Sequence, residues 1–169
     1  MEATPGTISA AMYQRVLIPL DGSPIAESIL PFISKIAGPL DMEVVLVRVV
    51  PLASEQAMGI ASTVGLDSVE AGEREAQRYL NAHVEGLWAK GLRAQAQVVI
   101  GDPAPEIVAC AHKVGADLIA MTTHGRSGLS RLMMGSVAEE VLRSAAIPVF
   151  LMRMVQASAS QVPAEEKRA

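Results

Sequence analysis

The sequence predicts an α/β fold: a single domain with an open five-stranded parallel sheet and helices on both faces. Short runs rich in Val, Ile and Leu alternate along the chain with amphipathic stretches of helical length, which is typical of β-α-β units. Apolar residues make up 50% of the 169 residues and aromatic residues only 3%. The core must therefore consist of aliphatic side chains, which suits a parallel sheet covered by Ala-rich helices.

The folded domain is expected to cover residues 12–154. Residues 1–11 and 155–169 are rich in small and polar residues without a period, so both ends should be disordered. The length between them fits one domain.

The first strand is predicted over "RVLIPL" (15–20), and a helix follows from Ser23 to Ala37. Ser23 and Pro24 form a good cap and first-turn pair, and the apolar residues of this segment share one helical face. Pro31 lies inside the segment and should kink the helix.

The second strand is predicted over "EVVLVRVV" (43–50), and the next helix over residues 67–90. An apolar stripe supports this helix, formed by Val69, Ala76, Leu80, Val84 and Leu87. Residues 51–66 have little period and two glycines, and they are expected to form a long loop, either a flap over a ligand or a tolerated surface connection.

The third strand, "RAQAQVVI" (93–100), alternates between apolar and polar residues, which places it at an edge of the sheet because one of its faces is less buried. Asp102 and Pro103 then begin a helix that runs through Val114. The single cysteine, Cys110, cannot form an internal disulfide, and its helical spacing predicts a small buried side chain.

The fourth strand, "DLIAMT" (117–122), is followed by a glycine-rich loop and by a helix from Ser136 to Ala145. Glu139 stands three residues after Ser136, which is the spacing of a capping box. The last strand is "PVFLMR" (148–153). The alternation of strands and helices predicts right-handed crossovers and a parallel sheet.

Charge and segment length exclude two classes of partner. The net charge is −4 and there is no cluster of Lys or Arg on one element, which argues against a nucleic-acid-binding surface. The first residues are acidic where a signal peptide would be basic, and no apolar run approaches the length of a membrane span. A cytoplasmic location without membrane contact is expected.

Open sheets of this kind bind ligands beyond the carboxyl ends of their strands, where the winding direction reverses. The ends of the first, second and third predicted strands read "PLDGS" (19–23), "VRVVP" (47–51) and "IGDPAPE" (100–106). The fourth strand ends in the glycine-rich loop, so these four segments are the candidates for a binding site.

The loop "THGRSGLSRLMMGS" (123–136) has the features of a phosphate site. Gly125 allows close approach of the backbone, Gly135 and Ser136 present amides at a helix N-terminus, and Arg126 adds positive charge. The alternative is that the glycines only let the loop fold and that Ser136 is only a cap. The spacing matches neither the P-loop nor the G-x-G-x-x-G pattern.

With these residues the chain resembles the universal stress protein family over nearly all of residues 15–153. The ATP-binding members of that family carry Gly, two residues, Gly, nine residues, and then Gly followed by Ser or Thr. Here Gly125 is followed by nine residues and by Gly135 and Ser136, whereas Thr122 stands in place of the first glycine.

The resemblance implies the strand order 3-2-1-4-5 and a site for ATP. Residues beside the adenine and ribose would be Pro19, Leu20, Asp21 and, through its backbone, Val49. Residues along the ribose and phosphates would be Met121, Thr122, His124, Gly125, Gly135, Ser136, Val137 and Ala138. Any Mg²⁺ would arrive with the triphosphate and keep several waters.

Several of these residues have structural alternatives. Asp21 precedes Gly22 and can simply begin a turn. Val49 can be a core residue, and His124 is better suited to orienting the loop than to catalysis. His83 and His112 have no partners at metal-ligand spacing, so a built-in metal site is not expected.

The last strand is apolar and is expected at an outer edge, which favours pairing with another chain. The resemblance implies an antiparallel homodimer with Val149, Phe150, Leu151 and Met152 at the seam; the alternative is an edge covered by the C-terminal tail.

Three functions follow as hypotheses. The first is a stress protein that binds ATP as a regulatory or sensing ligand, with at most slow hydrolysis because no catalytic apparatus is visible. The second is a nucleotide-free homodimeric interaction module. The third, a nucleotidyl-transfer enzyme, would need a second substrate pocket or domain.

Overall fold

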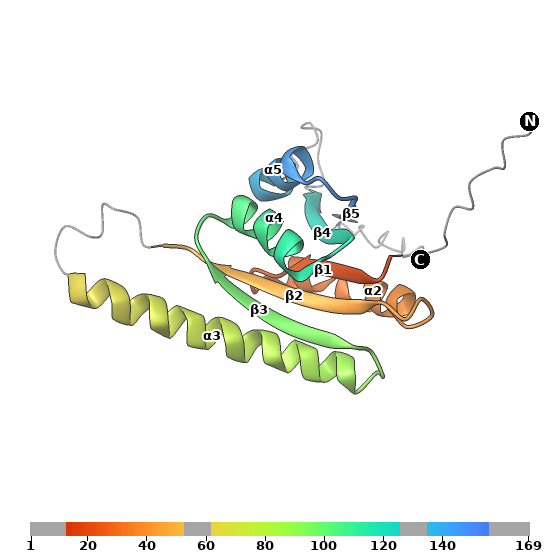
Figure 1. Cartoon of the computed structure of the whole chain (residues 1–169), viewed down its shortest axis with the longest axis horizontal. Coiled ribbons are helices and arrows are strands. Elements are labelled where there is room, and N and C mark those ends of the chain that lie inside the picture. The colour runs from red at the N-terminus through yellow and green to blue at the C-terminus, as the bar shows by residue number, and fades with distance from the viewer. Residues whose placement is uncertain (1–12, 53–61, 126–134, 156–169) are drawn as a thin grey trace, which may run out of the picture.

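The computed structural model describes residues 13–52, 62–125 and 135–155, which form a five-stranded sheet with helices on both faces (Figure 1). The strands are β1 (Arg15–Pro19), β2 (Glu43–Val50), β3 (Ala94–Ile100), β4 (Leu118–Gly125) and β5 (Val149–Val155). The helices are α1 (Pro24–Glu27), α2 (Leu30–Ala37), α3 (Ser62–Trp88), α4 (Pro103–Val114) and α5 (Ser136–Ser144). Neighbouring strands are parallel in the order β3-β2-β1-β4-β5, so the predicted fold class and strand order are confirmed.

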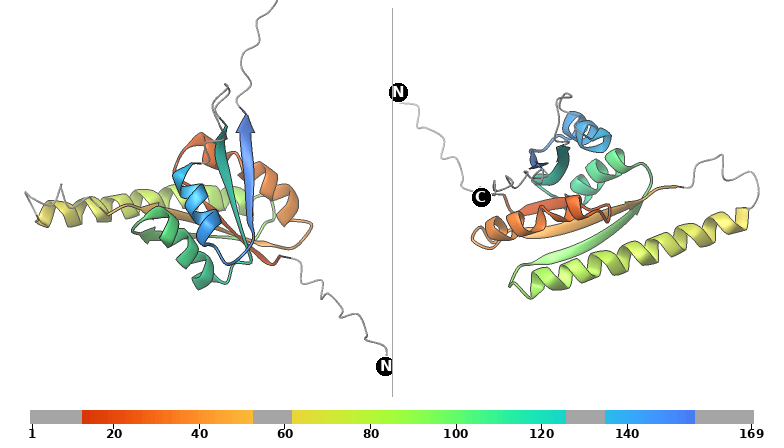
Figure 2. Two further views of the ribbon diagram at one scale, coloured as in Figure 1. Left: turned by 90° about the horizontal axis from the view of Figure 1, so that it is seen from above. Right: turned by 180° about the vertical axis from the view of Figure 1, so that it is seen from behind.

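Alternate side chains of the central strands enter two separate cores, one on each face of the sheet. Val16 and Ile18 of β1 pack in the core formed with α2 and α3, whereas Leu17 packs in the core formed with α4 and α5. In β2, Leu46 and Val47 divide in the same way, and all these side chains are fully buried. The views in Figure 2 show the two layers of helices on opposite sides of the sheet. Burial on both faces explains why these strands are continuously apolar in sequence.

The first predicted helix is interrupted rather than only kinked: α1 and α2 are separated by Ser28 and Ile29, which keep right-handed helical dihedral angles. Ser23 caps α1 as predicted, since its Oγ accepts the Ala26 N–H at 3.1 Å. The break follows Glu27, and α2 begins at Leu30 with Pro31 in its first turn. A proline ring without an N–H is tolerated in a first turn but not in a helix interior, which favours two short helices over one bent helix.

Helix α3 begins at Ser62, five residues before the predicted start, so the expectation of a loop through residue 66 is wrong. Figure 1 shows that the N-terminal turns of α3 extend past the sheet. Turns that do not pack on a sheet need no apolar period, and that period was the signal used for prediction. Residues 53–61 of the predicted loop lie outside the described residues. The predicted stripe is confirmed where α3 crosses the sheet, with Leu80 and Val84 in the core.

Strand β3 lies at an edge of the sheet, as its alternating sequence predicts. Helix α4 follows it, with Asp102 at the N-cap and Gly115 at the C-cap in the left-handed conformation (φ 65°). Cys110 is only 3% exposed, which confirms the predicted burial, and this burial raises the pKa of its thiol.

The junction between β4 and α5 differs from the prediction in two ways. Strand β4 continues through Gly125, three residues further than predicted, because it stays paired with β5 up to Gly125 and Val155. The predicted capping box is wrong: Gly135 is the N-cap and Ser136 the first helical residue, while the Glu139 carboxylate pairs with Arg143 at 2.6 Å.

Strand β5 ends at Val155, and the expected domain limits of residues 12 and 154 stay a prediction. The predicted disordered ends, 1–11 and the rest of 155–169, lie outside the described residues. None of the helices within the described ranges is both long and apolar enough to cross a bilayer.

Candidate functional site

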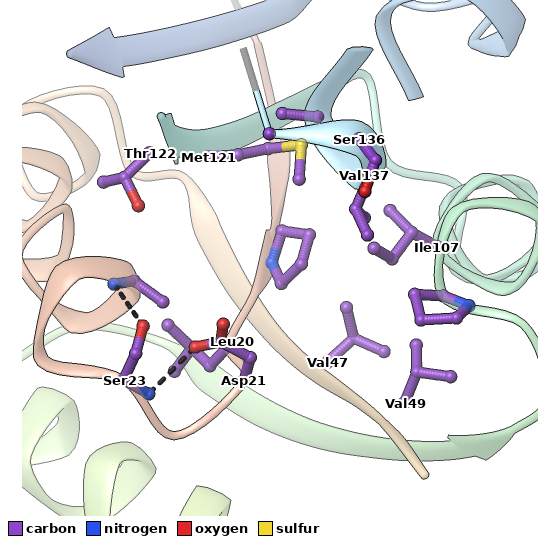
Figure 3. Close-up of a pocket in the computed structure, with 15 residues that line it drawn as sticks. Leu20, Asp21, Ser23, Val47, Val49, Ile107, Met121, Thr122, Ser136 and Val137 are labelled. Carbon is purple, nitrogen blue, oxygen red and sulfur yellow. Dashed lines mark hydrogen bonds between the residues drawn. The ribbon is translucent and has the colours of Figure 1, made fainter. Parts of the chain in front are cut away.

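A pocket of about 420 Å³ lies at the carboxyl ends of β1, β2 and β4 (Figure 3). The chain leaves β1 for the face covered by α2 and α3, and it leaves β4 for the face covered by α5, so the winding direction reverses between these adjacent strands. The residues that line the pocket are Pro19, Leu20, Asp21, Ser23, Ala26, Val47, Val49, Pro103, Ile107, Met121, Thr122, Gly135, Ser136, Val137 and Ala138.

One side of the pocket is apolar. Val47 and Val49 lie two residues apart on β2 and therefore share a face of the sheet, and Pro103 and Ile107 lie four residues apart at the start of α4. Figure 3 shows Val47, Val49 and Ile107 grouped together on this side. An apolar, planar chemical group would lose little hydration free energy and gain dispersion contacts here.

The opposite side is polar and is built by the turn that follows β1. Asp21 Oδ1 accepts the Ser23 N–H at 2.8 Å, so Asp21 does begin a turn while its carboxyl group lines the pocket. Gly22 between them has φ +87°, which a residue with a Cβ adopts only with strain. The half-buried Thr122 of β4 completes this side.

The N-terminus of α5 forms the third part of the pocket. The backbone N–H groups of Ser136, Val137 and Ala138 occupy the first three helical positions and have no acceptor within the helix. Gly135 makes no side-chain capping bond, so these amides are not capped from within the helix. Aligned amides and the positive end of the helix dipole favour an anionic group at this place.

A polar network borders the turn after β1, where a Cβ built on Gly22 would lie 3.5 Å from the Arg48 guanidinium. The Arg48 guanidinium lies 4.7 Å from the centroid of the Tyr79 ring and 3.2 Å from Glu75. The Tyr79 hydroxyl donates to Glu27 of α1 at 2.9 Å. Burial, and then this hydrogen bond, raise the pKa of Tyr79, so the hydroxyl keeps its proton and remains a donor. Sequence reasoning missed this network because its members lie far apart in the chain.

Ten of the thirteen residues predicted for the site line this one pocket. They are Pro19, Leu20, Asp21, Val49, Met121, Thr122, Gly135, Ser136, Val137 and Ala138. His124 and Gly125 belong to β4, and Arg126 lies outside the described residues. Whether any of the thirteen contacts a ligand stays a prediction.

Five lining residues were not named individually as site residues: Ser23, Ala26, Val47, Pro103 and Ile107. Ser23, Val47 and Pro103 lie within the strand-end segments that were candidates for the binding site. Ala26 and Ile107 lie outside those segments, on α1 and α4. Among the described residues, no group of three His, Cys, Asp or Glu side chains is arranged to hold a metal ion.

Comparison with known proteins gives one consistent family. The family model described as the universal stress protein family matches residues 12–153. Universal stress protein MJ0531 of Methanocaldococcus jannaschii is 33% identical over 142 residues, which cover 84% of this chain and 83% of the relative.

Solved structures show the same fold. The structure of MJ0577 from the same organism superimposes with a TM-score of 0.73 at 26% identity and covers 86% of this chain and 99% of that one. The universal stress protein from Archaeoglobus fulgidus in complex with dAMP superimposes with a TM-score of 0.58 at 21% identity, over 82% of this chain and 97% of that one.

Proposed function

The chain belongs to the universal stress protein family, and we propose that it binds ATP, or a closely related adenine nucleotide, as a regulatory or sensing ligand in the cytoplasm. The observation that carries the proposal is the division of one pocket into an apolar side, a polar side and a helix N-terminus. A nucleotide has the same three parts, namely a base, a sugar and a phosphate chain.

The base is assigned to the apolar side. The partly exposed Val49 of β2 and Pro103 of α4 offer aliphatic surface to a planar ring, and the buried Val47 and Ile107 pack behind that surface. A pocket of about 420 Å³ falls within the range of about 300–1,000 Å³ that is usual for small-molecule sites.

The phosphates are assigned to the N-terminus of α5, where the amides of Ser136, Val137 and Ala138 lie. The Archaeoglobus fulgidus protein in complex with dAMP shows that a protein of this fold can hold an adenine nucleotide. A similarity of 21% identity establishes the shared fold only. The assignment of phosphate contacts therefore rests on the residues of this chain.

The proposal is one of binding rather than turnover. Among the lining residues that the structure describes, Asp21 is the one titratable side chain, and no lysine, arginine or histidine accompanies it. Phosphoryl transfer needs cationic groups that stabilise the transferring phosphate and a group that positions the nucleophile. We therefore expect hydrolysis to be slow at most.

Nucleotide binding is tested by thermal unfolding of the whole protein with and without ATP and Mg²⁺. A ligand at a hundred times its dissociation constant stabilises the folded state by about 2.7 kcal/mol, which corresponds to roughly 5–10 °C for a chain of this size. Mass spectrometry of nucleotide released from the purified protein identifies which adenine nucleotide is held. No shift at millimolar ATP would favour the nucleotide-free interaction module.

We also propose that the protein is a homodimer that pairs along β5. This strand is an outer strand of the sheet, and Val149, Phe150, Leu151 and Met152 are only partly buried. The Phe150 ring stacks on the 39% exposed Phe32 of α2, with centroids 5.1 Å apart. An apolar outer strand favours pairing with a second copy. Sedimentation velocity at micromolar concentration should show a dimer, and a monomer alone would contradict this part of the proposal.

A further inference from the structure

Thr122 lies where β4 continues beyond the end of its neighbour β1. The two strands pair Val16 with Leu118 and Leu17 with Ile119. On this side the paired residues of β4 end at Ile119, so Thr122 lies beyond them. On its other side Thr122 pairs with Met152 of β5.

The Thr122 hydroxyl is available to a ligand. Figure 3 shows its oxygen directed into the pocket, toward the side where Asp21 and Ser23 lie. No described residue forms a hydrogen bond with this hydroxyl. Its oxygen is not a buried atom that lacks a partner, so solvent or a ligand can reach it. By contrast, the Ser23 hydroxyl on the same side is already used, because it accepts the Ala26 N–H at 3.1 Å.

We propose that the Thr122 hydroxyl forms a hydrogen bond with a sugar hydroxyl of the bound nucleotide and thereby makes the site select ribonucleotides over deoxyribonucleotides. This inference rests on the proposed function. It assigns Thr122 as a specificity-determining residue of the same pocket.

The neighbours of Thr122 explain why it meets the sugar and not the phosphates. The Asp21 carboxylate lines the same side of the pocket, and its negative charge repels a phosphate but accepts hydrogen bonds from sugar hydroxyls. The phosphates are assigned to the amides of α5 instead, and the base is assigned to the aliphatic side that includes Val47, Val49 and Ile107. The sugar is the part of a nucleotide that joins these two places.

A threonine hydroxyl can both donate and accept, so it can pair with either sugar hydroxyl in either direction. A deoxy analogue that lacks the partner hydroxyl leaves this hydrogen bond unmade. One neutral hydrogen bond of this kind corresponds to about a tenfold difference in affinity.

The test compares three ligands by calorimetry at fixed Mg²⁺: ATP, 2′-deoxy-ATP and 3′-deoxy-ATP. The wild-type protein should bind ATP about tenfold more tightly than at least one of the two analogues. Thr122→Val keeps the shape and the branching at Cβ but removes the hydroxyl. It should lower ATP affinity about tenfold, leave the affinity for the discriminated analogue unchanged, and abolish the difference between the two. Thr122→Ser retains the hydroxyl and should retain the preference.

The outcomes separate the two proposals. If the wild type binds ATP but Thr122→Val has the same preference between ATP and both analogues, Thr122 is not the specificity determinant. A loss of affinity that is equal for all three ligands would mean a structural role only and would also overturn the inference. If the wild type binds none of the three at millimolar concentration, the proposed function itself fails, and the inference fails with it.

Discussion

At the amino ends of the strands, polar groups are paired with one another. The Asp117 carboxylate accepts the backbone N–H groups of Gln14 at 2.7 Å and Arg15 at 3.1 Å. The Arg15 side chain pairs with Glu43 at 2.7 Å and also donates to the backbone carbonyl of Val114. Each of these charged groups has its partner within the protein, so the polar groups at this end of the sheet have a structural role.

At the carboxyl ends of the same strands, several polar groups lack such partners. The first amides of α5 have no acceptor within the helix, and the Thr122 hydroxyl has none among the described residues. Since polar groups in folded proteins are almost always paired, groups left unpaired around a pocket indicate where a ligand belongs. Pairing within the protein, more than residue type, therefore separates structural polar groups from binding groups in this molecule. Substitutions at the amino end should therefore change stability alone, whereas substitutions at the carboxyl end should change binding.

The largest effect is expected for Gly135→Val at the carboxyl end. Gly135 lines the pocket, and a Cβ built on it meets no described atom within 4 Å, so the fold can accept a side chain there. A branched side chain beside the first amides of α5 would obstruct phosphate binding, and we expect ATP affinity to fall by about a hundredfold or more. Calorimetry measures this affinity.

Gly86→Val is the matched control for Gly135→Val. Gly86 lies on the exposed part of α3, its added Cβ also meets no described atom within 4 Å, and it does not line the pocket. This variant should bind ATP as the wild type does. Equal affinity of the Gly135 variant and the control would mean that phosphate does not bind at α5.

The sequence predicts the fold better than it predicts which residues line the pocket. Fold class and the edge position of β3 follow from apolar periodicity, because that pattern reflects burial directly. The strand order, by contrast, is expected only from the resemblance to the family. The pocket depends on which segments meet in space. Ile107, for example, lies on α4 outside the candidate strand-end segments, and only the fold brings it to the same pocket as Val47.

The errors at the two ends of the glycine-rich loop have a common cause. Thr123, His124 and Gly125 have no strand-like apolar pattern, yet pairing with β5 keeps them in β4. Ser136 has the side chain of a good N-cap, yet Gly135 occupies that position. In both cases a tertiary contact or the backbone path overrides a local preference, and such an override leaves no signal in a single sequence.

A smaller effect, on stability alone, is expected for Asp117→Ala at the amino end. This change leaves the N–H groups of Gln14 and Arg15 without their carboxylate acceptor and should lower the free energy of unfolding by about 2 kcal/mol. ATP affinity should stay within about twofold of wild type, because the pocket lies at the other end of the sheet. Urea denaturation and calorimetry measure the two quantities. Asp117→Asn keeps one acceptor and should lose less, and a parallel fall in affinity would show that the two ends are coupled.

The smallest effect concerns Cys110, which lies on α4 between the two ends. Burial raises the pKa of this thiol, so above about pH 8.5 the unfolded chain releases the proton while the folded protein retains it. The free energy of unfolding of the wild type should therefore fall as the pH rises from 8 to 10, by less than the single-proton limit of about 1.4 kcal/mol per pH unit. In Cys110→Ala this contribution is absent, so the difference in stability between wild type and variant should narrow over that range in urea titrations. Parallel stability curves would mean that the thiol titrates alike in both states. ATP affinity should not change as the thiol titrates, because Cys110 does not line the pocket. A change in ATP affinity over the same pH range would show that α4 couples the protonation of Cys110 to nucleotide binding.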